Sequence, residues 1–318
     1  MVGKLTKDDI CTSSIVVALF DEAKWGSKQK ALANCIKARK GDNVRFEQTP
    51  WQEIGDLLEP VLIAKSCKRL GITEYDADIT EKRSHAFLPL EASLDGIAWC
   101  KDHVVKEDKE NGIYLPQGQD QIVLDGSVVI ECKCTRDFPE DMPPPHLGVR
   151  QCQSSCEVTG SDFYIICILY NSTDLRTYVF EKDPTFINKL KPLVEDFNRR
   201  INEEDYYDIS ISEDAYHIYS DADVSEDTLV FDTKQIDHVD EYIELKKMAG
   251  KYNEMADIAM GRLMMHMGNF SKAQAANYEI SWPSRNYKEV KASTKDIAWK
   301  AARTIRQKQL TIKDTNNG

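Results

Sequence analysis

The spacing of apolar residues predicts alternating helices and strands over the first 200 positions of the chain. A capping box at 49–52 (Thr-Pro-Trp-Gln) opens a helix that continues at helical spacing until Gly71. Its apolar members are Trp51, Ile54, Leu58, Val61, Leu62 and Leu70. Pro60 lies inside this helix, so we expect a bend there and a freed carbonyl at Asp56.

Extended segments and further helices follow this first helix. A β-branched apolar run at 128–130 is typical of a buried strand, and a polar stretch before it predicts a long hairpin loop. The predicted strands cover 86–99, 123–134, 163–170 and 175–181, and the predicted helices cover 147–158 and 184–201. This alternation indicates an α/β fold.

Charge changes the picture beyond residue 200. The chain carries a net charge of −12, and residues 201–250 account for all of it with 3 basic and 15 acidic side chains. Residues 251–318 hold 12 basic and 6 acidic side chains, and apolar residues recur at helical spacing over 237–267. We therefore predict a core at 1–200, an acidic linker or insertion at 201–236, and a helical, basic extension at 237–318.

The acidic stretch and the basic extension suggest different partners. The acidic stretch repels phosphates, so it should lie outside any DNA channel as a mobile loop or contact a basic partner. Cations and aromatics alternate at the end of the chain, a pattern that suits a single strand of nucleic acid. These residues are Trp282, Arg285, Tyr287, Lys288, Lys291, Trp299, Arg303 and Arg306. The alternative is that Trp282 and Trp299 pack the extension onto the core.

Composition excludes several classes of protein. No apolar run is long enough to span a membrane and the first residues lack the core of a signal peptide, so we expect a cytoplasmic protein. The nine cysteines show no repeated Cys-x-x-Cys spacing. That pattern favours reduced thiols over disulfides or structural zinc.

Candidate chemistry is concentrated at the ends of two predicted strands. Glu131 and Lys133 are two positions apart, so they project to the same face. Asp95 ends the preceding extended segment and comes alongside Glu131 if the two segments pair antiparallel. Two converging carboxylates form a site for a hard divalent cation. The alternative is a structural Glu–Lys pair near a sheet edge.

Two further residues favour a functional metal site over a structural ion pair. Glu59 lies beside Pro60 on the upstream helix, and Gln151 opens the helix that follows the strand of Glu131 and Lys133. Each alone is typical of an ordinary polar helix surface. The order helix-Glu, strand-Asp, strand-Glu-x-Lys, helix-Gln is much rarer by chance.

This order resembles the YqaJ-type viral recombinase family, the lambda-exonuclease-like branch of the PD-(D/E)xK nucleases. The resemblance covers roughly residues 5–200. It runs through 11–14 (Cys-Thr-Ser-Ser), 55–60, 93–97 (Ser-Leu-Asp-Gly-Ile), 130–134 (Ile-Glu-Cys-Lys-Cys), 151–153 (Gln-Cys-Gln) and 158–159 (Val-Thr). It implies a restriction-endonuclease-like core, in which a mixed central sheet is flanked by helices, followed here by a mainly helical C-terminal extension.

The resemblance also implies a metal site. Asp95 and Glu131 would bind Mg²⁺ together with the main-chain carbonyl of Cys132, and Mn²⁺ is an expected substitute. Glu59 would bind a second ion or hold the ligands of the first in place. Two ions per site are therefore expected.

The remaining roles concern water and DNA. By the resemblance, Lys133 would position the nucleophilic water and Gln151 would hold that water or the scissile phosphate. The expected contacts to DNA or its 5′-phosphate are Lys7, Thr12, Ser14, Arg150 and Gln153. The chain departs from the family pattern where Lys7 replaces an Arg and Thr135 replaces a Pro.

The implied function is a 5′ to 3′ exonuclease on linear double-stranded DNA. The best-known members of the family are ring-shaped homotrimers that leave 3′ single strands for an annealing protein, which is usually encoded by a phage. If this chain is phage-encoded, its expected place is the cytoplasm of a bacterial host. An endonuclease of the same fold and a non-catalytic DNA-end-binding scaffold remain alternatives. The related iron–sulfur nucleases are disfavoured, because no cysteine follows Cys167 to complete a cluster.

Overall fold

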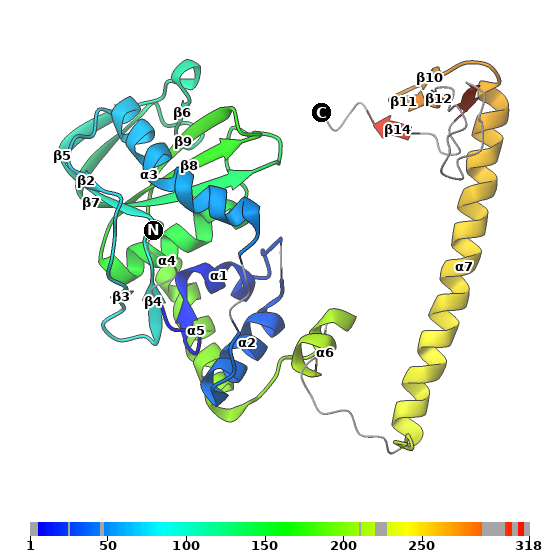
Figure 1. Ribbon diagram of the computed structural model, residues 1–318, viewed down its shortest axis with the longest axis horizontal. Helices are drawn as coiled ribbons and strands as arrows, with labels where there is room; N and C mark the ends of the chain where they lie inside the picture. Colours follow the sequence, from blue (N-terminus) through cyan, green and yellow to red (C-terminus); the bar gives the residue numbers. More distant parts are fainter. Residues whose placement is uncertain are drawn as a thin grey trace, which may run out of the picture. The chain divides into compact units, whose positions relative to one another are not determined.

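The chain forms two units in the computed structural model, residues 1–223 and 224–318 (Figure 1). The structure describes residues 6–24, 26–44, 48–209, 211–219, 228–287, 303–306 and 311–314.

A six-stranded mixed sheet forms the centre of the first unit, in the order β2-β5-β7-β8-β9-β6. Its strands are β2 (Tyr75–Asp76), β5 (Gly96–Lys106), β6 (Ile113–Tyr114), β7 (Gln121–Thr135), β8 (Phe163–Tyr170) and β9 (Asp174–Glu181). β5 and β7 pair antiparallel, whereas β7 and β8 run parallel through the crossover helix α4 (Arg150–Thr159). The predicted antiparallel pairing of the two extended segments is therefore confirmed.

Helices cover both faces of this sheet. One core lies under α3 (Pro50–Leu70), where Ile63 and Cys67 pack with Ile130 of β7. The opposite core includes Cys152 of α4 packed with Val129 of β7. Neighbouring positions of β7 thus face opposite helices, and the predicted mixed sheet flanked by helices is confirmed.

Helix α3 begins as predicted but buries less of its apolar stripe. The Thr49 side chain accepts a hydrogen bond from the Gln52 backbone, the Gln52 side chain accepts one from the Thr49 backbone, and Gly71 ends the helix at φ 74°. Leu62 and Leu70 are buried, whereas Trp51, Ile54 and Val61 are 38%, 48% and 61% exposed. The residues of α3 that are buried all follow Pro60.

A third core joins helices near the two ends of this unit. It contains residues of α1 (Ser13–Leu19), α2 (Lys28–Lys40) and α5 (Phe186–Glu203). A small sheet of β1 (Cys11–Thr12), β4 (Leu90–Ala92) and β3 (Arg83–Ser84) adjoins it. The short helices η1 (Lys109–Asn111) and η2 (Pro145–Val149) complete the connections.

Part of the acidic stretch belongs to this first unit. Helix α6 (Ser212–Tyr219) contains Asp214, which is buried and accepts a hydrogen bond of 2.5 Å from the Ser27 hydroxyl. The first unit therefore extends past the predicted core boundary at residue 200, and α6 is an ordered element rather than a mobile loop.

The second unit combines one long helix with short strands. The helix α7 (Thr233–Met267) matches the helix predicted at 237–267 and starts at a capping box formed by Asp232 and Gln235. Short strands follow the helix: β10 (Lys272–Ala275), β11 (Tyr278–Ser281), β12 (Ser284–Tyr287), β13 (Arg303–Arg306) and β14 (Thr311–Asp314). Apart from Trp282, the side chains of the predicted basic, aromatic end lie outside the described residues.

We find no helix in the described part of the chain that is both long and apolar enough to cross a membrane.

Candidate active site

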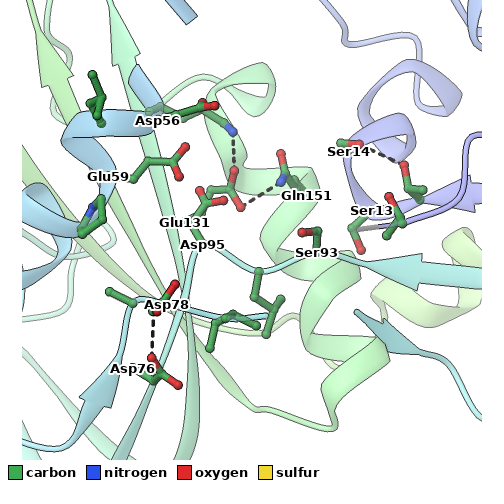
Figure 2. A pocket seen from close by; sticks show the side chains of 18 of the residues that line it. Ser13, Ser14, Asp56, Glu59, Asp76, Asp78, Ser93, Asp95, Glu131 and Gln151 are labelled. Carbon is green, nitrogen blue, oxygen red and sulfur yellow. Dashed lines mark hydrogen bonds and ion pairs between the residues drawn. The ribbon is translucent and has the colours of Figure 1, made fainter. Parts of the chain in front are cut away.

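Residues from separate elements meet at a cavity of about 700 Å³ in the first unit (Figure 2). Seven of the residues predicted from the sequence line it: Thr12, Ser14, Glu59, Asp95, Glu131, Lys133 and Gln151. The structure thus brings together positions that are up to 139 residues apart in the sequence, from Thr12 to Gln151.

Strand register places Asp95 beside Glu131. Gly96, the first residue of β5, pairs with Ile130 of β7, so Asp95 comes next to Glu131 at the end of the antiparallel ladder. The main-chain N–H of Cys132 donates to Oδ2 of Asp95 at 2.8 Å, which fixes one carboxylate oxygen of Asp95 against β7.

Glu131 is held from two sides. Its carboxylate is buried, with Oε1 bonded to Nζ of Lys133 and Oε2 accepting a 2.8 Å hydrogen bond from Nε2 of Gln151. Gly148 of η2 has φ 98°, and a Cβ at that position would lie 3.3 Å from Cγ of Glu131. Glycine is therefore required both for this backbone conformation and for the close approach of η2 to Glu131.

The carboxylates raise the energy of one another's charged forms. Burial, and then the charge of Asp95, raise the pKa of Glu131 to about 8, although Lys133 opposes the shift. Burial and the charge of Asp95 also raise the pKa of Glu59 to about 7. Burial lowers the pKa of Lys133, but the charges of Glu131 and Asp95 outweigh burial and raise it. The ammonium group is therefore positively charged at neutral pH.

The cavity is acidic beyond the predicted residues. Among the described residues that line it, Lys133 is the one lysine or arginine. The lining carboxylates are Asp56, Glu59, Asp76, Asp78, Asp95 and Glu131. Asp56, Asp76 and Asp78 were missed from the sequence because they lie in α3 and around β2, away from the recognised motifs. This excess of negative charge favours binding of a cation.

The donors present fit a magnesium ion better than a zinc ion. In a strand, the N–H and C=O of one residue point to the same edge, so the carbonyl of Cys132 faces the side on which Asp95 accepts its N–H. Mg²⁺ is usually bound by one or two carboxylates and keeps several waters. Zinc instead requires three or four protein ligands, and no His, Cys, Asp and Glu side chains in the described residues form such a group of three or more.

Hydroxyl groups line another part of the cavity. The Thr12 and Ser14 hydroxyls are 2.9 Å apart, and Ser13 and Ser93 also contribute to the lining (Figure 2). Ser93 was not predicted as a site residue. Its position two residues before Asp95 in an extended segment could have indicated that it lies on the same side of the chain. Such hydroxyls can donate to phosphate oxygens.

Three predicted DNA contacts lie elsewhere. Lys7 is not among the lining residues, and its main-chain N–H is 3.4 Å from Oε2 of Glu91. Arg150 forms two hydrogen bonds with Glu22, at 2.6 and 2.7 Å, and its guanidinium stacks on a phenyl ring. Its charge is thus already paired.

Gln153 requires a correction as well. Its side chain is buried, its Oε1 accepts from the Asp183 backbone at 3.1 Å, and its Nε2 donates to the Tyr164 hydroxyl at 3.3 Å. These contacts make it a structural link between α4, β8 and the segment before α5. Position 153 is two residues after 151 on a helix, so the two side chains point in different directions.

Comparisons with known proteins find similarity only at the level of structure. Neither a protein-family model nor a curated protein matches the chain. The chain is similar to the alkaline exonuclease LHK-Exo from Laribacter hongkongensis, with 19% identity over 62% of this chain and 90% of that one, at a TM-score of 0.43. It is also similar to a phage-related exonuclease from Haemophilus somnus, with 15% identity over 61% of this chain and 94% of that one, at a TM-score of 0.42.

Proposed function

We propose that this chain is a metal-dependent deoxyribonuclease that degrades linear double-stranded DNA from its ends. The observation that carries the proposal is the convergence of Glu59, Asp95, Glu131, Lys133 and Gln151 on one acidic cavity. These side chains come from α3, the start of β5, β7 and α4. A structural Glu–Lys pair would need neither the additional carboxylates nor the cavity.

Each residue has a chemical task in this proposal. Asp95, Glu131 and the carbonyl of Cys132 would hold Mg²⁺ or Mn²⁺, and Glu59 would serve a second ion. When bound, the cation would stabilise the charge that develops on the phosphate and lower the pKa of a bound water. Lys133 is positively charged, 32% exposed and directed at the same carboxylate, so it can orient the attacking water.

The hydrolysis itself forms one bond and breaks another. The water oxygen bonds to phosphorus while the bond from phosphorus to one ester oxygen breaks. The attacking water gives one proton to solvent, and the leaving oxygen takes one proton from solvent to become a hydroxyl. Gln151 donates to Glu131 through Nε2, which leaves its Oε1 able to accept from the attacking water. A phosphate at Lys133 would place the terminal nucleotide toward the hydroxyls of Thr12 and Ser14.

Digestion of labelled DNA tests the proposal. With Mg²⁺, linear duplex should be degraded while covalently closed circles persist, and chelation by EDTA should stop degradation. Labels at the 5′ or 3′ ends would show the polarity, for which we propose 5′ to 3′ with 3′ single strands as product. Efficient nicking of closed circles would favour an endonuclease. Binding of DNA ends without any metal-dependent cleavage would favour a non-catalytic scaffold.

Assembly and partners form a separate part of the proposal. The family resemblance suggests a homotrimer that encloses DNA and supplies 3′ strands to a single-strand annealing protein. Light scattering of the full chain would test the trimer, and a monomer at micromolar concentration would contradict it.

A further inference from the structure

We propose that a second cavity beside the candidate active site binds a nucleotide of the DNA strand, with Trp51 as the stacking platform for its base. This cavity measures about 570 Å³, a size that suits a small organic ligand. It lies between α1, the start of α3, the end of β7 and η2. Its lining residues are Val17, Ala23, Lys24, Trp51, Lys133, Cys134, Thr135, Arg136, Asp137, His146 and Leu147.

The two cavities meet at Lys133. Of the described residues, Lys133 alone lines both cavities, and it contacts Glu131 at the centre of the first. This inference rests on the proposed function: if a scissile phosphate lies at Lys133, the strand extends into the first cavity on one side and into the second on the other. The second cavity would then hold a nucleotide adjacent to the cleaved bond.

The second cavity has the opposite charge to the first. Three cationic residues line it, Lys24, Lys133 and Arg136, against one carboxylate, Asp137, which is paired with Lys24 at 2.6 Å. The first cavity holds one cationic residue and six carboxylates. A cation is therefore favoured in the first cavity, whereas an anionic sugar–phosphate backbone is favoured in the second.

Trp51 is placed to stack on a base. Its indole is 38% exposed, and the Arg136 guanidinium lies 4.9 Å from its ring centroid. A planar cation already occupies a position over the ring that a nucleobase could take. Arg136 is exposed and has no ion pair within the described residues, so it can leave the ring and contact a phosphate.

His146 supplies an additional polar group. Its Nε2 is buried and has no hydrogen-bond partner in the described structure, and the nearest carboxylate oxygen, from Asp137, is 3.9 Å away. A buried polar atom without a partner is uncommon in a folded protein. A heteroatom of a bound nucleotide would satisfy it.

Three variants test the proposal: W51A removes the aromatic ring, W51F keeps an aromatic ring, and W99A is the control. Trp99 lies on β5 and is 43% exposed, which is similar to Trp51, but it lines neither cavity. Binding would be measured by anisotropy with linear duplex carrying a single-stranded 5′ end, in Ca²⁺ to limit cleavage. A 2-aminopurine placed in turn at each position near the end would report stacking through its fluorescence quenching.

We expect W51A to raise Kd for this DNA by roughly ten- to a hundred-fold, the range for loss of one stacked base. In W51A, quenching of 2-aminopurine should disappear at one position only, and W51F should retain much of it. W99A should bind and quench like the unaltered protein. Binding of Mn²⁺ in the absence of DNA, measured by calorimetry, should be unchanged in W51A, because Trp51 does not line the first cavity.

Two results would overturn the subsite. The first is W51A binding DNA as tightly as W99A with unchanged quenching. The second is W51A losing Mn²⁺ binding together with DNA binding, because that pattern would show damage to the active site itself. Failure of the proposed function is distinguishable, since the unaltered protein would then not degrade linear duplex DNA with Mg²⁺.

Discussion

Replacing Glu131 with glutamine should stabilise the metal-free protein, even though it should abolish catalysis. The glutamine side chain keeps the shape of glutamate, and it can still accept from Lys133 and bond to Gln151. It removes only the negative charge that burial and Asp95 disfavour. A catalytic residue whose loss stabilises the fold would be difficult to explain as a structural ion pair.

The magnitude follows from the pKa of Glu131. Burial and Asp95 raise it from an ordinary value of 4.5 to about 8. The folded state therefore binds a proton that the unfolded state releases between those values, so stability falls as pH rises through this window. At about 1.4 kcal/mol per pH unit, the full loss approaches 5 kcal/mol, of which about 3 kcal/mol falls between about pH 5 and about pH 8.

Denaturant unfolding in EDTA would measure this effect. The free energy of unfolding of the unaltered protein should decrease from about pH 5 to about pH 8, and E131Q should lose about 3 kcal/mol less over the same range. Glu59, whose pKa is also raised, should leave some residual slope in E131Q. E53Q, which alters an exposed carboxylate on the same helix as Glu59, should behave like the unaltered protein.

Added Mg²⁺ should make the unaltered protein more stable than E131Q. A cation stabilises ionised Glu131, so it should raise the stability of the unaltered protein most at high pH and that of E131Q much less. Equal pH slopes for E131Q and the unaltered protein, or destabilisation of E131Q at about pH 8, would refute the reasoning that Glu131 sits in an electrostatically unfavourable site.

Three further predictions concern residues around Glu131. Lys133→Met should reduce turnover on linear DNA on the order of 10²- to 10⁴-fold, with the Kd for DNA nearly unchanged. Turnover equal to that of the unaltered protein would show that Lys133 does not take part in the proposed chemistry. Gly148→Ala should destabilise the protein by about 1–2 kcal/mol, because alanine is strained at φ 98°. It should also lower kcat, because its Cβ would press on Glu131. Unchanged stability and kcat would refute the close approach of η2 to Glu131. Gln151→Ala should lower kcat at unchanged stability. Gln153→Ala should instead lower the melting temperature and leave the kcat of the remaining folded protein unchanged. The reverse pattern would show that Gln153 contacts DNA.

The sequence alone determined the main elements and the central motif. The capping box at 49–52 and Gly71 set both ends of α3 through local hydrogen bonding and backbone conformation. The side-chain period of two in a strand placed Glu131 and Lys133 on one face, and an antiparallel partner placed Asp95 beside them. These features depend on residues that are close in sequence or on the register of a single hairpin.

Only the tertiary structure decided which polar residues reach the site. The sequence motif treats Gln151 and Gln153 alike, yet the first contacts Glu131 and the second is buried against Tyr164. Arg150 was expected at DNA, but Glu22, 128 positions earlier, pairs with it. Such pairings depend on how distant elements pack, which no local pattern encodes.

Exposure was likewise settled by packing. The apolar pattern of α3 includes Trp51, but the fully buried residues of this helix all follow Pro60. Periodicity shows which side of a helix is apolar, not how far along that helix a partner extends. The contact of the half-exposed indole of Trp51 with Arg136 in the second cavity therefore depends on tertiary packing.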